Sequence, residues 1–414
     1  MVLLAITLVA NVAGAPVRVA PSGHSKAGPG DDTPSIQKAL SAAEKQGGNM
    51  VELGPGTYRL RGPLVMPEGV TLAGVWQAPH HAQLKKGTVF EVYAGKGEEN
   101  GPPLIKLSPS STVKGITFFY PQQRIPGTIP YPWTIQGEGM HNSVIDCTFV
   151  NAYKAMDFGT LANELHYVRN CFGCPLKVGI WVNQCTDIGR LENVHFNPHY
   201  WERAEVEGIP NTEDLRKYLQ ENLVAFDFGW SDWEYVQNTF CYGAKVGYLF
   251  REGTKLGTNG NFLGIGADWC GRAILVELCQ PYGLLITNGE FVGARGAECM
   301  VEVAASNNGV VQFNNCSFWG LCDVVARTDG RGAASFSQCH FLNYSRERPD
   351  SYTIEAVGGD LIVQGCRFGR DRPDIKLGEK VRTAVIVGNH FKATKGIKNL
   401  SKGDVQEGFN VAGQ

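Results

Sequence analysis

The stretches FNNCSF at 313–318, FSQCHF at 336–341 and VQGCRF at 363–368 repeat one short pattern. Apolar or β-branched residues precede a small polar residue, often asparagine, which is often followed by cysteine, one variable residue and phenylalanine. The other copies are VIDCTF at 144–149, VRNCF at 168–172, LENVHF at 191–196, VQNTF at 236–240, ITNGEF at 286–291 and VGNHF at 387–391, with weaker copies GITFF at 115–119 and TNGNF at 258–262. Such self-similarity predicts one structural unit repeated along the chain.

The spacing of the repeated phenylalanines predicts the architecture. Successive positions lie 22 to 29 residues apart, with one interval of 44 residues between Phe196 and Phe240. A period in this range is typical of a solenoid, and the segments between copies are short, β-branched and interrupted by glycine, without a helical period. We therefore predict an all-β fold, a single-stranded right-handed parallel β-helix, because parallel crossovers are almost always right-handed. The positions are Phe149, Phe172, Phe196, Phe240, Phe262, Phe291, Phe318, Phe341, Phe368 and Phe391.

Stacked coils bring equivalent residues into columns about 4.8 Å apart. The phenylalanine column is predicted to be core, since aromatic rings bury a large apolar area. A second column of cysteines is interpreted as small buried thiols rather than as a redox site. The cysteines and histidines lack zinc-site spacing, so we predict neither a metal nor another cofactor. The cysteine column is Cys147, Cys171, Cys316, Cys339 and Cys366.

The composition narrows the possible partners. The 38 Lys and Arg against 40 Asp and Glu argue against a nucleic-acid partner, and the absence of a long internal apolar run argues against a membrane span. The apolar residues 2–12 followed by Ala13-Gly14-Ala15 resemble the end of a signal peptide. Residues 1–15 are thus expected to be a signal-peptide remnant, with a buried first strand as the alternative. We expect a secreted, periplasmic or cell-surface protein.

Residues 16–414 are predicted to form one domain, with an N-terminal cap at 31–46 and coils over about 50–395. In the cap, Thr33 is expected at the N-cap with Pro34 at the first helical position. An apolar stripe follows, and Gly47-Gly48 ends the helix. The stripe consists of Ile36, Ala39, Leu40 and Ala43.

The segment 29–75, GDDTPSIQKALSAAEKQGGNMVELGPGTYRLRGPLVMPEGVTLAG with its flanking residues, resembles the opening of pectate-lyase-like, polygalacturonase-related right-handed β-helix proteins. The resemblance implies a secreted or surface protein acting on polysaccharides by hydrolysis or lyase chemistry. Of the polygalacturonase motifs N-T-D, D-D, G-H-G and R-I-K, only Asp31-Asp32 occurs, within the cap, and the pectate-lyase motif R-x-P-x-x-R does not occur. The resemblance therefore implies the superfamily rather than either of these activities.

Alternation along three aligned strands predicts a catalytic face. The apolar pairs in AMDFG at 155–159, GIWVN at 179–183 and AFDFG at 225–229 must point inward, which turns Asp157, Trp181 and Asp227 outward in one column. We expect Thr134 to hold the same outward position on the preceding coil. Backbones two coils apart lie about 9.6 Å apart, so the carboxyls could approach the separation of about 6.5–9.5 Å of inverting glycosidases. This predicts a glycoside hydrolase with Asp157 and Asp227 as acid and base.

Residues beside this column are interpreted as substrate-binding. Trp181 is expected to offer its ring to a sugar, and Gly159 and Gly229 to leave room for a glycan chain. Asn183 and Arg251 fall in the adjacent outward column, where Arg251 could pair with an acidic sugar or keep Asp227 ionised.

The segment GWSDWEY that follows AFDFG adds further candidates. Trp230 and Trp233 are predicted sugar platforms, and Asp232 is an alternative catalytic carboxylate. His141, His166 and His195 lie near turns and are interpreted as structural histidines.

Two insertions, 119–133 and 197–222, are predicted lids, because solenoid insertions often cluster on the binding face. The second carries Tyr200, Trp201 and Glu202 as candidate binding residues and a short helix from Asn211 or Thr212 to Asn222. The alternative is that the insertions shield a sheet edge.

Three functions remain open from the sequence. The first is a glycoside hydrolase acting on a polysaccharide or oligosaccharide. The second is a polysaccharide lyase, which requires a uronic acid and a basic catalyst such as Arg251. The third is a non-catalytic carbohydrate-binding or adhesin solenoid. The sugar, the linkage and the oligomeric state do not follow from the sequence.

Overall fold

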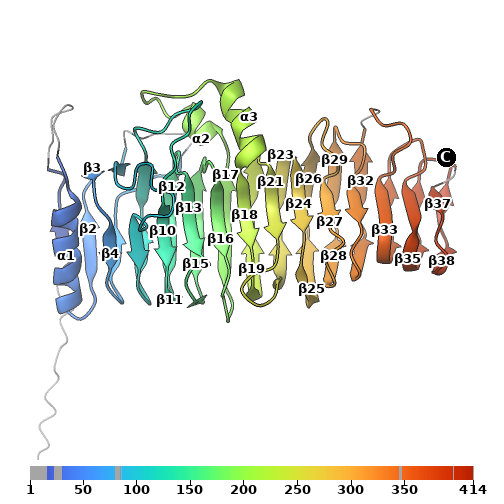
Figure 1. Cartoon of the computed structure of the whole chain (residues 1–414), viewed down its shortest axis with the longest axis horizontal. Helices are drawn as coiled ribbons and strands as arrows, with labels where there is room; N and C mark the ends of the chain where they lie inside the picture. Colours follow the sequence, from blue (N-terminus) through green and yellow to red (C-terminus); the bar gives the residue numbers. More distant parts are fainter. Residues whose placement is uncertain are drawn as a thin grey trace, which may run out of the picture.

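Parallel strands wound into successive coils build the protein (Figure 1). The structure, a computed structural model, describes residues 16–22, 30–79, 84, 86–344, 347–394 and 396–413. The described strands form one 37-stranded sheet, apart from the small pair β11 (Gly139–Met140) and β14 (Asn163–Glu164). This confirms the predicted right-handed parallel β-helix. The predicted signal-peptide residues 1–15 lie outside the described residues.

The strand pairings define three faces, here called the first, second and third face in the order in which a coil passes through them. The first face contains β4 (Leu64–Met66), β7 (Ile105–Leu107), β10 (Trp133–Gly137), β13 (Lys154–Phe158), β16 (Val178–Val182), β18 (Val224–Phe228), β21 (Val246–Phe250), β24 (Arg272–Val276), β27 (Val301–Val303), β30 (Ala326–Thr328) and β37 (Ile397–Asn399). The second face contains β1 (Val17–Val19), β2 (Met50–Leu53), β5 (Thr71–Ala73), β8 (Thr112–Lys114), β19 (Ser231–Gln237), β22 (Thr258–Leu263), β25 (Cys279–Thr287), β28 (Val310–Asn314), β31 (Ala333–Ser337) and β38 (Asp404–Gly408).

The third face contains β3 (Gly56–Leu60), β6 (Thr88–Val92), β9 (Ile116–Phe119), β20 (Phe240–Tyr242), β23 (Gly266–Cys270), β26 (Glu290–Gly293), β29 (Ser317–Gly320), β32 (His340–Asn343), β34 (Arg367–Phe368), β36 (His390–Phe391) and β39 (Val411–Ala412). Longer strands turn a corner: β12 (Ser143–Phe149), β15 (Tyr167–Gly173) and β17 (Arg190–Phe196) run from the second face to the third, and β33 (Ile354–Gln364) and β35 (Ile375–Val387) from the first to the second. The coils thus extend beyond the predicted range of about 50–395 at both ends.

The repeated sequence pattern is the corner between the second and third faces. Its small polar residue adopts a left-handed backbone conformation, with φ between 51° and 55° for Asp146, Asn170, Asn193, Asn288 and Asn315. Asparagine and aspartate tolerate this conformation better than other non-glycine residues, which explains their recurrence. The chain's twelve cysteines are all buried and free, which includes the column predicted to consist of buried thiols.

The phenylalanine column is largely as predicted, and its rings stack. Phe341 and Phe368 lie 4.7 Å apart between centroids with planes 7° apart. Three members deviate. Phe262 lies on the second face, where it pairs with Val236 and Ile286. In the other two repeats, the core position of the Phe149 column is taken by Gly173 instead of Phe172, and Phe240 pairs with His195 instead of Phe196. Both repeats are one residue shorter between the turn residue and the phenylalanine, and a one-residue slip turns a strand side chain to the other side of the sheet.

Helix α1 (Thr33–Lys45) covers the N-terminal end of the solenoid and buries its predicted apolar stripe (Figure 1). The N-cap position is Asp32 rather than Thr33. The Asp32 carboxylate accepts from the Arg59 backbone N–H at 2.8 Å, and the Thr33 hydroxyl accepts from the Arg61 N–H at 3.1 Å. These polar residues therefore join the cap to β3 instead of capping the helix.

The second insertion forms α2 (His199–Glu202) and α3 (Thr212–Asn222), on one edge of the solenoid (Figure 1). Asn211 is the N-cap of α3, and its side chain accepts from the backbone of Glu213 at 2.9 Å, which confirms the predicted helix. α3 leads into the beginning of β18, so this insertion lies at the end of the first face where strands start. No helix among the described residues is long and apolar enough to cross a membrane.

Candidate functional site

The predicted column of Asp157, Trp181 and Asp227 exists as a structural feature of the first face. Asp157 on β13 pairs with Trp181 on β16, which pairs with Asp227 on β18. Their strand neighbours Met156 and Phe226 are buried in the core, so alternation places the three side chains on the outer side. The residue paired with Asp157 on the preceding coil is Gln136 rather than the expected Thr134.

Asp157 is fully buried, although it lies on the outer side of the strand. Its Oδ2 accepts from Gln136 Nε2 at 2.6 Å, and its Oδ1 accepts from the backbone N–H groups of Gly159 at 2.9 Å and Thr160 at 2.8 Å. These bonds hold the corner where the chain leaves the first face. Both carboxylate oxygens therefore have internal donors and no solvent contact.

Asp227 forms a bidentate ion pair with Arg251. Arg251 Nε lies 2.8 Å from Oδ1 and Nη2 lies 3.0 Å from Oδ2, and Asp227 is only 6% exposed. Burial raises the pKa of Asp227 above its ordinary value, while the Arg251 guanidinium acts in the opposite direction. The predicted pairing of Arg251 with Asp227 is thus present.

Trp181 fills the space that the neighbouring glycines were expected to leave for a glycan. A Cβ on Gly159 would lie 2.3 Å from Trp181 Nε1, and one on Gly229 would lie 2.7 Å from the indole ring. Arg251 covers the indole, with its guanidinium carbon 4.1 Å from the ring centroid. The glycines therefore accommodate the indole, and the arginine occupies a ring face that was expected to receive a sugar.

Asn183 lies beside the column of Asp157, Trp181 and Asp227, which is here called the wall of the first face, on the side of the second face. Its Oδ1 accepts from the backbone of Trp230 at 3.1 Å and of Thr254 at 3.0 Å, and its Nδ2 donates to Gly159 O and to the Thr254 hydroxyl. With the amide used internally and the residue 7% exposed, Asn183 links coils rather than facing an open site.

The predicted binding residues of the second insertion are also internal. Trp201 and Tyr200 are buried. Glu202 is paired with Arg216 Nε at 3.1 Å. These contacts correct the expectation of an open aromatic lid and show that the insertion shields an edge of the coil.

A groove of about 680 Å³ opens instead on the second face, just past the corner after β18. Two sequence-predicted residues, Asp232 and Trp233, lie in it. Trp233 is 55% exposed and Tyr282 is 78% exposed. The groove is lined by Asp232, Trp233, Leu256, Asn259, Gly260, Asn261, Gln280, Tyr282, Gly283 and Leu285.

Irregular pairing of three stacked strands produces this groove. Ser231 and Glu234 of β19 pair with Thr258 and Gly260 of β22, so two residues oppose one. On the next coil, four residues, 280–283, separate the partners of Thr258 and Gly260. Extra residues of this kind bend a strand and redirect its side chains, and here they supply most of the groove lining.

The bulge residues present aromatic rings to solvent. Trp233 has a left-handed backbone, with φ of 69°, and its N–H donates to Asn259 Oδ1 at 3.2 Å. The expected platform Trp230 is instead 8% exposed; Lys255 Nζ lies 4.4 Å from its ring centroid. Among the described lining residues of the groove, Trp233 and Tyr282 are thus the aromatic rings available to a ligand.

Asp232 is the charged residue among the groove's described lining residues. Its Oδ1 accepts from Gln280 Nε2 at 2.7 Å and from Trp230 Nε1 at 3.2 Å. Gln280 Nε2 also donates to the carbonyl of Gly257 at 3.0 Å. The carboxylate is therefore held in a fixed orientation in the groove wall.

A buried ion pair lies directly beneath the bulge. His166 Nε2 is 3.0 Å from Glu234 Oε1, and both side chains are inaccessible to solvent. His166 Nδ1 lies 2.9 Å from Asn163 Oδ1. The orientation of the Asn163 amide is fixed because its Nδ2 donates to two backbone carbonyls. His166 thus donates from both nitrogens. Burial lowers the pKa of His166, but Glu234 and Cys185 together raise it to about 10. The Ser231 hydroxyl completes the network by donating to Glu234 Oε2 at 2.6 Å.

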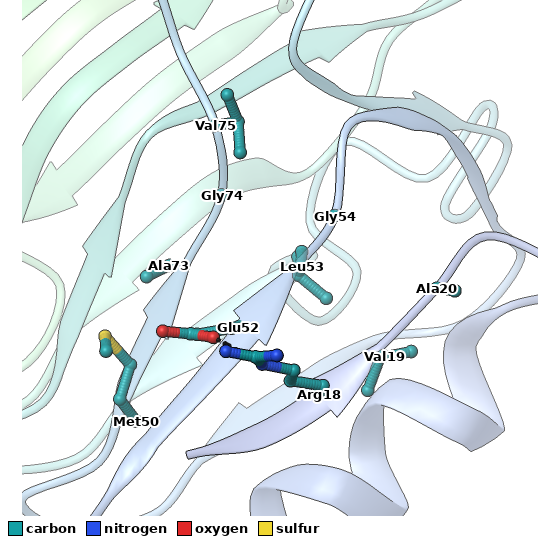
Figure 2. Close-up of a pocket in the computed structure, with 10 residues that line it drawn as sticks. All are labelled: Arg18, Val19, Ala20, Met50, Glu52, Leu53, Gly54, Ala73, Gly74 and Val75. Atoms are coloured by element: carbon teal, nitrogen blue, oxygen red, sulfur yellow. Dashed lines mark hydrogen bonds and ion pairs between the residues drawn. The ribbon is translucent and has the colours of Figure 1, made fainter.

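A second cavity, of about 480 Å³, lies beside β1, β2 and β5 near the N-terminal end (Figure 2). Its polar feature is the exposed ion pair of Arg18 Nε and Glu52 Oε2 at 3.0 Å, and its described lining contains no aromatic side chain. Over the described residues as a whole, no three His, Cys, Asp or Glu side chains gather in a way that could hold a metal ion.

The sequence interpretation missed Tyr282, Asn259 and Gln280. The interval between Phe262 and Phe291 is 29 residues, longer than any other apart from the 44-residue interval. The bulge at 280–283 does not cause this length, because Phe262 lies on the second face and Phe291 on the third, and the paired residues Phe262 and Ile286 are 24 residues apart. The interval between phenylalanines therefore carried no signal for the bulge.

No protein-family model matches the sequence, and no curated protein matches it significantly. Solved structures do match. A double mutant of the tailspike protein of E. coli bacteriophage HK620 is 11% identical, with 96% of this chain and 78% of that chain covered and a TM-score of 0.55. The catalytic unit of a thermostable family 87 α-1,3-glucanase from Streptomyces thermodiastaticus is 14% identical, with 96% and 69% covered and a TM-score of 0.50. At these identities the likeness shows the fold.

Proposed function

We propose that this protein binds a glycan in the groove between Trp233 and Tyr282. The observation that carries the proposal is a pair of exposed aromatic side chains, on coils separated by the coil of β22, beside a groove of about 680 Å³. Apolar ring faces pack against the C–H faces of sugars, while amides such as Asn259 and Asn261 exchange hydrogen bonds with hydroxyls. A secreted or cell-surface location, as expected from the sequence, suits this function.

The fold supports the proposal at a coarse level. The α-1,3-glucanase is built on the same coil architecture, which supports a glycan-directed function on this scaffold. The wall formed by Asp157, Trp181 and Asp227 offers less to a ligand, because Arg251, Gln136 and backbone N–H groups occupy its carboxylates.

Binding of soluble polysaccharides by affinity electrophoresis tests the proposal. Trp233→Ala and Tyr282→Ala should each weaken retardation at least about tenfold, the scale of an interface hot spot. Tyr344→Ala is the matched control, because Tyr344 is 56% exposed and lies outside the groove lining. Equal binding by wild type and both groove variants would refute the proposed site.

Hydrolysis of a glycosidic bond is a second candidate function, favoured by the carboxylate of Asp232 in the groove wall. In this second candidate function, Asp232 takes part in cleaving the glycosidic bond of the bound sugar. The alternative catalytic carboxylates are those of the pair Asp157 and Asp227. New reducing ends without ultraviolet absorbance indicate hydrolysis, and an ultraviolet-absorbing product indicates a lyase. Loss of turnover in Asp232→Asn supports the groove, whereas loss only in Asp157→Asn and Asp227→Asn, with folding intact, supports the pair.

A further inference from the structure

The groove carries charge of one sign. Among its described lining residues Asp232 is the one carboxylic acid, and none is Lys, Arg or His. Recognition of a carboxylate sugar depends on cations, above all arginine, whose paired donors match two oxygens. The lining therefore lacks the group that a uronic acid or a sulfated sugar requires.

The nearest cations along the chain are committed elsewhere. Lys255 Nζ lies 4.4 Å from the ring centroid of Trp230, and Trp230 Nε1 donates to the Asp232 carboxylate. Arg251 is held by both oxygens of Asp227. Neither residue lines the groove.

Asp232 has a fixed position. Two donors hold its Oδ1, and Gln280, the nearer donor, is itself anchored to the backbone carbonyl of Gly257. The carboxylate thus stays in the groove wall when an anionic ligand approaches, and two like charges in close contact repel.

From these contacts we propose that the groove selects neutral glycans and that Asp232 excludes polyuronates. This inference rests on the proposed glycan binding and names its substrate class. Hydroxyl groups can accept from the amides of Asn259 and Asn261 and donate to Asp232, so a neutral sugar satisfies the polar lining without an unpaired charge. The same reasoning places the lyase alternative, which needs a uronic acid, outside this groove.

Affinity electrophoresis in gels containing dextran, laminarin, galactomannan, polygalacturonate or alginate tests the inference, using the full chain at low ionic strength. Wild type should bind at least one neutral polysaccharide and be retarded only weakly by either acidic one. Asp232→Asn should bind the acidic polysaccharides about fivefold more strongly than wild type, the factor for two like charges about 4 Å apart in water. Asp371→Asn removes an exposed carboxylate outside the lining and should change nothing.

The outcomes separate this inference from the function on which it rests. Binding of polygalacturonate or alginate by wild type as tightly as any neutral polysaccharide overturns the inference but leaves glycan binding intact. Unchanged acidic binding in Asp232→Asn also overturns it. If no polysaccharide of either kind binds, the proposed function itself fails.

Discussion

The buried pair of His166 and Glu234 should make the stability of the protein depend on pH. His166 has a pKa of about 10 in the folded protein against an ordinary value of 6.5. A base whose pKa is raised by folding contributes its full stabilisation below the unfolded value and loses it as the pH rises through the folded value. The stabilisation is thus present below pH 6.5 and is lost between pH 6.5 and about 10.

The size of this effect follows from the two pKa values. At 1.36 kcal/mol per pKa unit, the difference corresponds to at most about 5 kcal/mol, which is a large part of the roughly 5–15 kcal/mol that stabilises a typical domain. Glu234→Gln removes the charge that holds the proton on His166. The variant should be much less stable than wild type at pH 6, and the difference should shrink toward pH 10.

Urea unfolding followed by circular dichroism at pH 6, 7, 8, 9 and 10 measures this difference. Glu138→Gln is the matched control, because Glu138 pairs with Lys106 at 2.8 Å on the surface, where such a pair is worth about 0–1 kcal/mol. A difference between wild type and Glu234→Gln that stays constant over this range would refute a charged His166.

Other predictions concern the wall of the first face and the C-terminal coils. Gly159→Ala should lower the melting temperature in thermal denaturation, because its Cβ would meet the Trp181 indole at 2.3 Å and overpacking costs about 1–3 kcal/mol. Arg251→Met should cost about 3–5 kcal/mol in urea unfolding, because it leaves the buried Asp227 unpaired, and an unchanged midpoint would contradict the ion pair. Burial raises the pKa of Asp374 to about 7, so wild type should lose stability as the pH rises from about 4 to 7; Asp374→Asn should lack this component in melting curves at pH 5 and pH 8.

The repeat made the coil architecture predictable. Local backbone geometry favours asparagine at the left-handed turn, cysteine at a buried position and phenylalanine pointing inward. Each preference is weak alone, but its repetition along the chain makes the pattern recognisable. Alternation with period two also placed Asp157, Trp181 and Asp227 on one outer column. These features depend on backbone geometry, which a short sequence pattern determines.

The exposure of those side chains could not be predicted in the same way. Whether Asp157 is open or buried depends on Gln136 of the preceding coil and on the course of the chain after Gly159. The groove depends on bulges, whose extra residues interrupt the very alternation used to align strands. Trp233 was identified from its residue type, whereas Tyr282 lay in a segment that matched no repeat.

A crystal structure with a soaked neutral oligosaccharide tests the central claim most directly. The account predicts ordered sugar against the rings of Trp233 and Tyr282, with a hydroxyl within hydrogen-bond distance of Asp232. Sugar bound instead across Asp157, Trp181 and Asp227, with nothing beside the two exposed rings, would contradict it.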